Sequence, residues 1–229
     1  MRGPEGTATL ALLAALALAA PALAQVSASL GLQSDYRLRG VSLTDRRPAL
    51  SLSVSGDFAS GAYLGGSLIG QQTSEGSRDL GHVEYLGYAV RTAGGASIDV
   101  GVNNQDFTVY GGRPFQLKYN EVYAGLSKGD YSARLHYSPN WPGTETLYLD
   151  LNGAWRPVPR WRVAAHAGVF KPLDPPPGSP PARYDARLDL IREFRRGEVN
   201  LGWSVATPAQ RPQTRRSRGG VVVGLTTFF

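Results

Sequence analysis

The feature that most constrains the fold is a two-residue alternation of apolar and polar side chains, which begins at Val26. Apolar residues at 26, 28, 30 and 32 alternate with serine or other small polar residues, and similar runs follow to the C-terminus. Residues two apart share one face of a β-strand, so each run predicts a strand with one apolar and one polar face. The clearest of these runs lie at 50–58, 98–103, 147–155, 161–169, 199–205 and 221–229.

Weaker runs bring the expected number of strands to about twelve, and the connections between them alternate in length. The longer ones are expected at 40–48, 71–81, 104–119, 138–143, 171–183 and 207–218. Short turns at one end and long loops at the other are typical of transmembrane β-barrels. The sequence therefore predicts an all-β fold, a transmembrane antiparallel up-and-down barrel over residues 25–229, with short periplasmic turns and long extracellular loops.

A soluble antiparallel sandwich is the alternative, because its strands also alternate and a second sheet would cover the apolar face. A mean hydropathy of −0.22 does not separate the two folds. The barrel is favoured by aromatic residues that cluster toward both ends of the apolar face, as expected at two membrane interfaces. These residues are Phe58, Tyr131, Trp155, Trp161 and Phe229 at the short-turn end, and Tyr36, Tyr137 and Tyr184 at the other.

Residues 1–24 are expected to be an export signal. The apolar run 10–20 is too short to span a bilayer, and Ala22-Leu23-Ala24 fits the small-x-small rule for signal-peptide cleavage. A buried N-terminal helix is the alternative interpretation of that run. Cleavage near Ala24 would send the mature chain through the periplasm to the cell outer membrane.

The inward parity of the strands collects charged residues, so these are the predicted pore-lining side chains. They are Asp35, Arg37, Arg39, Asp57, Glu84, Asp99, Glu121, Arg134, Asp150, Arg162, Asp185, Arg187, Asp189 and Glu198. Acidic residues outnumber basic ones in this set, whereas the whole chain carries a formal charge of +6. The basic surplus therefore falls in loops, turns and strand ends.

A charged interior serves either a wet channel or a narrow barrel filled with ion pairs. Twelve strands give a backbone radius of roughly 12 Å, which leaves an opening about 12 Å across before any loop folds inward. The longest predicted loop, 104–119, could form a constriction, with Arg113 and Lys118 facing Asp106. A surface loop is an equally good interpretation of that segment. For Arg37 and Arg39, salt bridges within the wall are slightly favoured over a ladder that orients solutes.

One motif suggests a family. Residues 34–42, with the sequence SDYRLRGVS, are followed by Pro48-Ala49, and this element resembles the N-terminal motif of TorF-family porins of Gram-negative bacteria. Segments 119–127, 147–151 and 167–170 also resemble that family. The resemblance implies an outer-membrane pore. It also implies that the terminal Phe229 is the signal that the barrel assembly machinery reads, a role compatible with a place in the aromatic belt.

These observations predict a porin-like channel for passive diffusion of small hydrophilic solutes or ions. The alternative is a non-conducting outer-membrane barrel with a structural or surface-binding role. The expected partners are outer-membrane lipid, lipopolysaccharide at the basic loops, the assembly machinery and small hydrophilic solutes, but not nucleic acid. No cofactor, metal or catalytic residue is expected, because the chain has no cysteine, three scattered histidines and no catalytic motif.

Overall fold

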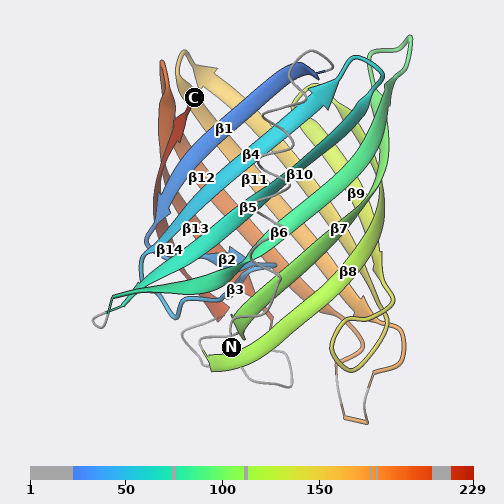
Figure 1. The fold of residues 1–229 in the computed structure, drawn as a ribbon, viewed down its shortest axis with the longest axis vertical. Coiled ribbons are helices and arrows are strands. Elements are labelled where there is room, and N and C mark those ends of the chain that lie inside the picture. The colour runs from blue at the N-terminus through green and yellow to red at the C-terminus, as the bar shows by residue number, and fades with distance from the viewer. Residues whose placement is uncertain (1–22, 74–75, 111–112, 176, 179, 208–217) are drawn as a thin grey trace.

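The computed structural model describes residues 23–73, 76–110, 113–175, 177–178, 180–207 and 218–229, and these residues form a closed antiparallel barrel (Figure 1). The barrel strands are β1 (Leu23–Gln33), β4 (Ala49–Phe58), β5 (Ala62–Thr73), β6 (Gly76–Arg91), β7 (Ser97–Tyr110), β8 (Arg113–Lys128), β9 (Tyr131–Ser138), β10 (Thr146–Val158), β11 (Trp161–Pro172), β12 (Arg183–Phe194), β13 (Gly197–Ala206) and β14 (Gly219–Phe228). A separate two-stranded sheet joins β2 (Arg37–Leu38) and β3 (Val41–Ser42). The predicted all-β barrel of about twelve strands is confirmed.

The barrel closes by pairing its first strand with its last. Strand β1 runs antiparallel to β14, from the pair Ser29 and Phe228 to the pair Gln33 and Gly224. Each described barrel strand therefore has a neighbouring strand on both sides, which is what allows strands to cross a bilayer. Among the described residues, no helix is long and apolar enough to cross a membrane. The predicted signal peptide lies outside the described residues, except for Leu23 and Ala24, which belong to β1.

The outer face of the barrel carries the exposed apolar side chains, and most of the charged side chains of the wall lie on the inner face. Large exposed residues on the outside include Leu52, Val100, Leu135, Leu188, Leu201 and Trp203. Aromatic residues stand at both ends of this face. Tyr131 (68% exposed) and Trp155 (65%) lie at the short-turn end, and Tyr184 (55%) lies at the long-loop end. Such a belt matches the lipid-facing surface of a membrane barrel and contradicts the sandwich alternative.

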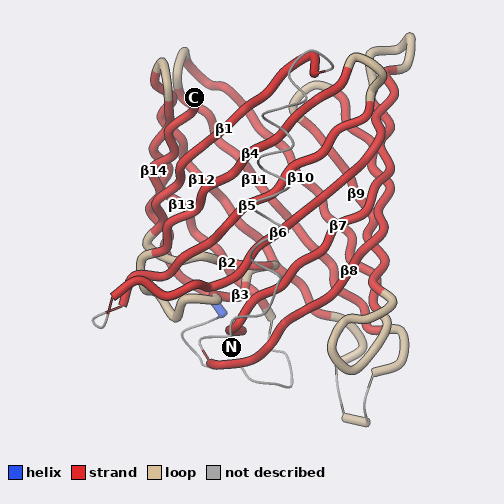
Figure 2. Tube along the Cα trace, in the orientation of Figure 1, coloured by secondary structure: helices blue, strands red, loops and turns tan. Residues whose placement is uncertain are grey.

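Two of the predicted long loops are instead strand. Segments 71–81 and 104–119 are mostly taken up by β5 and β6 and by β7 and β8. Figure 2 shows these hairpins as strands that reach the long-loop end. Polar residues at 103–106 ended the apolar alternation in the sequence, but backbone pairing continues through them to Phe107 and Leu117.

Glu84 is also misplaced by the sequence pattern, which predicted it to line the pore. It pairs with Gly66 and Asn104 and shares its parity with Leu86 and Tyr88, which are 53% and 47% exposed on the outside. Glu84 therefore lies on the outer face, because Tyr85 takes the inward position and its ring lies 6.3 Å from that of Tyr63. Tyrosines lie on both faces of β6, so the sequence pattern did not show which face of this strand points into the barrel.

Two adjacent alanines on β11 test which face meets lipid. Ala165 shares the outer parity with Val163 and Val169, whereas Ala164 shares the inner parity with His166. The change Ala165→Arg should lower the free energy of unfolding by about 2–4 kcal/mol in lipid vesicles, since it puts a charge in hydrocarbon.

The matched change Ala164→Arg should cost much less, because the new side chain enters the polar lumen beside Asp189. Urea titration followed by tryptophan fluorescence measures both values. Equal losses for the two variants would show that the assigned faces are wrong.

Candidate functional site

The first long connection, residues 34–48, folds into the barrel instead of extending away from it. Strands β2 and β3 lie within the barrel outline at its long-loop end (Figures 1 and 2). The side-chain amide of Gln71 on β5 donates to the Thr44 carbonyl at 2.9 Å. The guanidinium of Arg46 donates to the carbonyl of Gly219 on β14 at 2.7 Å. We call residues 34–48 the plug loop, since wall strands hold it from different sides.

Asp35 organises the plug loop. Its carboxylate is 1% exposed and accepts hydrogen bonds from the hydroxyls of Ser42 and Thr44 and from the backbone N–H of Arg46. The guanidinium of Arg37 forms an ion pair with it at 2.7 Å. A buried carboxylate is stable only with such partners, so the network ties both ends of the β2–β3 hairpin to one point.

The tip of the plug loop has a left-handed backbone and touches the wall. Arg39 has φ 49° and Gly40 has φ 73°. A Cβ atom at Gly40 would lie 2.7 Å from the Cβ of Asp185 and 2.7 Å from the carbonyl oxygen of Val205. Only glycine fits both this conformation and this approach to β12 and β13. Gly40 therefore sets how deeply Arg39 enters the barrel.

A hydrophobic core fills the barrel interior at the long-loop end. The plug loop contributes residues that pack against inward-facing wall residues. The fully packed members are Val41, Leu43, Ala49, Ile69, Leu80, Phe107, Val109, Tyr110, Leu117, Tyr119, Trp141, Tyr148, Phe170 and Ala206. Tyr36 and Leu38 pack against this core as well, and burial raises the pKa of Tyr36 to about 12. This end of the barrel is therefore largely filled by packed side chains.

Arg39 lies inside this core within a ring of aromatic side chains. Its guanidinium carbon is 4.1 Å from the centre of the closest ring and 5.6 Å from the farthest two. The four rings belong to Tyr119, Trp141, Tyr148 and Phe170. The guanidinium also forms an ion pair with Glu121, which is 2% exposed. We call these four rings and the Glu121 carboxylate the aromatic cage.

Toward the short-turn end, a polar cavity of about 280 Å³ opens next to the tip of the plug loop. Its lining residues are Arg37, Leu38, Arg39, Gly40, Gln105, Glu121, His136, Tyr148, Asp150, His166, Asp185, Arg187 and Ser204. Basic and acidic side chains both contribute, so the cavity presents hydrogen-bond donors and acceptors without a large excess of either charge.

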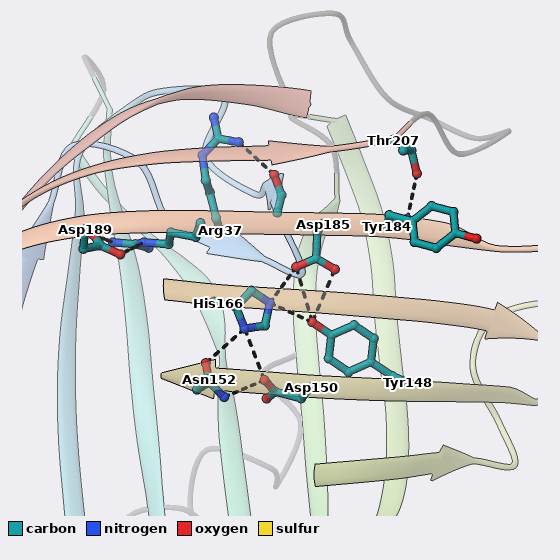
Figure 3. A network of polar contacts seen from close by, with 11 residues as sticks. Arg37, Tyr148, Asp150, Asn152, His166, Tyr184, Asp185, Asp189 and Thr207 are labelled. Atoms are coloured by element: carbon teal, nitrogen blue, oxygen red, sulfur yellow. Dashed lines mark hydrogen bonds and ion pairs between the residues drawn. The ribbon is translucent and has the colours of Figure 1, made fainter. Parts of the chain in front are cut away.

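One wall of the cavity is a continuous polar network on β10, β11 and β12 (Figure 3). His166 contacts Asp185 at 2.8 Å through Nε2 and Asp150 at 3.1 Å through Nδ1. The hydroxyl of Tyr148 donates to Asp185 at 3.3 Å. Because carboxylates face both ring nitrogens, both nitrogens act as donors and the imidazole carries a positive charge.

Further along the lumen, most predicted pore-lining residues form ion pairs with one another. Arg134 pairs with Asp99 at 2.8 Å, Arg162 with Glu193 at 2.9 Å and Glu198 at 2.6 Å, and Arg187 with Asp189 at 2.6 Å. Asp57 lies on the same inner parity and is exposed. These pairs favour the interpretation of the charges as wall salt bridges over that of a ladder of free charges.

The structure corrects the predicted position of the SDYRLRG motif. Asp35, Arg37 and Arg39 were expected on the first wall strand, with Tyr36 facing lipid, but β1 ends at Gln33. The alternation continues into the plug loop because the β2–β3 hairpin also has an apolar side, which meets the interior core instead of lipid. The Arg39-Gly40 pair was the available signal, since glycine after a strand favours a turn.

The segment that narrows the barrel interior also differs from the predicted one. The described parts of segment 104–119, residues 104–110 and 113–119, belong to the wall strands β7 and β8. Asp106 and Lys118 pair at 3.2 Å on the outer parity of these strands, and Arg113 begins β8. The plug loop occupies the interior instead. The aromatic cage was missed, because its rings come from separate segments of the chain and period-two alternation does not show which inward-facing rings meet. No group of histidine and acidic residues in the described segments could hold a metal ion.

The fit of Gly40 gives a direct test of the plug loop. Arg46 is exposed, but its N–H and guanidinium are held by Asp35 and Gly219. The change Gly40→Ala should push the loop off the wall and loosen the backbone at Arg46, so trypsin cleavage after Arg46 in the folded barrel should become at least tenfold faster. The control Gly129→Ala has a comparable positive φ of 59° but no atom within 4 Å of the added Cβ. It should leave the cleavage rate unchanged. Equal rates in both variants would contradict the contact at Gly40.

Solved structures of other proteins share the fold of this barrel. The KdgM porin superposes with a TM-score of 0.54 at 13% identity, covering 89% of this chain and 99% of that chain. A NanC porin structure gives a TM-score of 0.55 at 9% identity, covering 89% and 98%. At these identities the similarity establishes the fold alone. No curated protein matches the sequence.

A family model does match the sequence. It covers residues 18–173, well over half of the chain, and includes the plug loop, the four rings of the aromatic cage and Glu121. The family is described as a bacterial protein of unknown function. The chain therefore belongs to the Gcw_chp family.

Proposed function

We propose that the protein is a porin-like channel of the outer membrane, through which small hydrophilic solutes or ions diffuse passively. The observation that carries this proposal is the polar cavity of about 280 Å³ inside a closed barrel, separated from the long-loop end by the plug loop. Membrane barrels that conduct have polar interiors of this kind. The two solved structures of the same fold named above are porins, which supports the proposal.

Arg39 would be the narrowest point of the channel. It lines the 280 Å³ cavity on one side and, on the other, a hollow of about 10 Å³ that includes Tyr110, Phe170 and Arg183. That hollow has room for about one water molecule. The plug loop thus takes the constricting role that is one of the two interpretations of 104–119 in the sequence.

The expected roles of Phe229, of the basic loop residues and of the signal peptide are compatible with this proposal. Phe229 is 76% exposed at the end of the last strand, and its N–H donates to the Ala28 carbonyl at 2.9 Å, so its side chain is accessible to an assembly factor. Arg46 and Arg47 are exposed at the long-loop end, where phosphate groups of lipopolysaccharide would bind guanidinium well. The resemblance to TorF-family porins supports the same location, after cleavage of a signal peptide near Ala24.

A non-conducting barrel with a structural or surface-binding role is the second candidate. The hydrophobic core at the long-loop end favours it, because a mouth filled by packed apolar side chains blocks hydrated ions. The two candidates differ in one respect: a channel must conduct, at least when the contact of Arg39 is removed.

The change Arg39→Ala should raise single-channel conductance in a planar bilayer severalfold over that of the wild type. The reason is that the guanidinium lies between the cavity and the outer hollow. The control Arg192→Ala also removes an arginine that lies over an aromatic ring, 5.2 Å from that of Trp161, but on the outer face. Its conductance should equal that of the wild type.

Heat-modifiable migration in detergent gels checks that each variant is a folded barrel. If folded wild type, Arg39→Ala and Gly40→Ala all insert silently, the channel proposal is wrong and the non-conducting barrel stands.

A further inference from the structure

We propose that the aromatic cage is a binding site for a small organic cation of the guanidinium or methylated-ammonium type, and that Arg39 occupies it as a tethered ligand. The proposal concerns binding and does not require that the barrel conduct. Three observations support it: the position of the cage residues in the barrel, the charge of the cage, and its connection to the cavity.

The cage belongs to the wall and not to the plug loop. Tyr119 lies on β8, Tyr148 on β10 and Phe170 on β11, and Trp141 lies in the connection between β9 and β10. The Trp141 ring packs on those of Tyr119 and Phe170, with centroids 4.5 Å and 4.8 Å apart. Its backbone carbonyl accepts a hydrogen bond from the N–H of Thr144, which closes the turn. The rings of Tyr119, Trp141 and Phe170 therefore support one another without Arg39, and the hydroxyl of Tyr148 is held separately by Asp185.

The charge of the cage suits a cation. Aromatic faces attract cations within about 6 Å of the ring centre, and cages of several rings are a known way to bind quaternary ammonium groups. Glu121 adds a buried carboxylate, which also faces Nδ1 of His136 at 3.2 Å and the amide of Asn103 at 3.3 Å. A buried carboxylate that loses its cation is strongly destabilised. When Arg39 leaves, the cage therefore favours replacement of Arg39 by another cation.

The tethered arginine does not satisfy every group around it. Nη1 of Arg39 and the hydroxyl of Tyr119 are both buried without a hydrogen-bond partner among the described residues. The backbone at Arg39 is also in the left-handed region, which is unfavourable for a non-glycine residue. A free cation would not have this backbone cost.

A solute can reach the cage from the lumen. Arg39, Glu121 and Tyr148 all line the 280 Å³ cavity, so the cation position borders directly on it. That volume is close to the lower end of typical small-molecule sites, about 300–1,000 Å³. On the far side, Arg183 stacks on Phe170 at 3.8 Å and lines the narrow outer hollow. The cavity is therefore the roomier approach.

The test removes the tethered ligand and adds a free one. Arg39→Ala, folded in detergent, is titrated with methylguanidinium chloride, with tetramethylammonium chloride and with methylurea, a neutral molecule of nearly the same shape as methylguanidinium. Tryptophan fluorescence reports on Trp141, and thermal unfolding gives a second readout. At least one cation should bind saturably with a Kd of about 1 mM, as expected for about 4 kcal/mol of binding energy. That cation should also raise the Tm progressively as its concentration increases, as expected for a ligand that binds only the folded state, and methylurea should do neither.

Three controls define the site. Wild type should bind at least tenfold more weakly than Arg39→Ala, because Arg39 competes with the free cation for the cage, and Arg192→Ala should behave like wild type. The double variant Arg39→Ala with Glu121→Gln should bind at least tenfold more weakly. The double variant with Trp141→Phe should lose the fluorescence change.

The proposal is overturned if neither cation binds Arg39→Ala, if methylurea binds as well as the cations, or if Glu121→Gln has no effect. If Arg39→Ala does not fold unaided, the same three molecules are compared by refolding yield. Rescue by a cation but not by methylurea then supports the site, and equal yields contradict it. None of these readouts depends on conductance, so failure of the channel proposal would remain distinguishable.

Discussion

Complete backbone pairing around a closed ring of strands is the constraint on which the rest of this structure depends. In hydrocarbon, an unpaired N–H or C=O group costs several kcal/mol, so the chain must return its last strand to its first. The pairing of β14 with β1 meets that requirement. Closure then forces the two-residue alternation, because one face of every strand meets lipid and the other meets the interior.

The interior created by closure is divided by a single loop. One part is a packed hydrophobic core that contains the aromatic cage, and the other is a polar cavity lined by charged side chains. Asp35 fixes the shape of the plug loop, Gly40 sets its depth, and Arg39 joins it to Glu121. The SDYRLRG motif is therefore explained as a set of loop contacts. Those contacts connect the proposed channel with the proposed cation site, since both depend on the position of Arg39.

The sequence predicted the barrel, its strand number and the inward direction of residues such as Asp99 and Asp185, because period-two patterning follows directly from the two environments of a strand. The prediction failed where the same alternation arises from a different environment or is present on both faces of a strand. The plug loop alternates like a strand because its hairpin packs on an apolar core, and Glu84 lies on a strand where tyrosines occupy both faces. The cage joins residues far apart in the chain, so only the barrel register brings them together.

Cysteine accessibility is the most direct test of the claim that the plug loop lies inside the barrel. The chain has no cysteine of its own, so Val41→Cys and Arg47→Cys each introduce a single thiol. Val41 is 2% exposed, whereas Arg47 is exposed on the same loop. With a bulky, charged maleimide on the folded barrel, the account predicts rapid labelling at position 47 and no labelling at 41 until the protein is unfolded. Equally rapid labelling at both positions would contradict it.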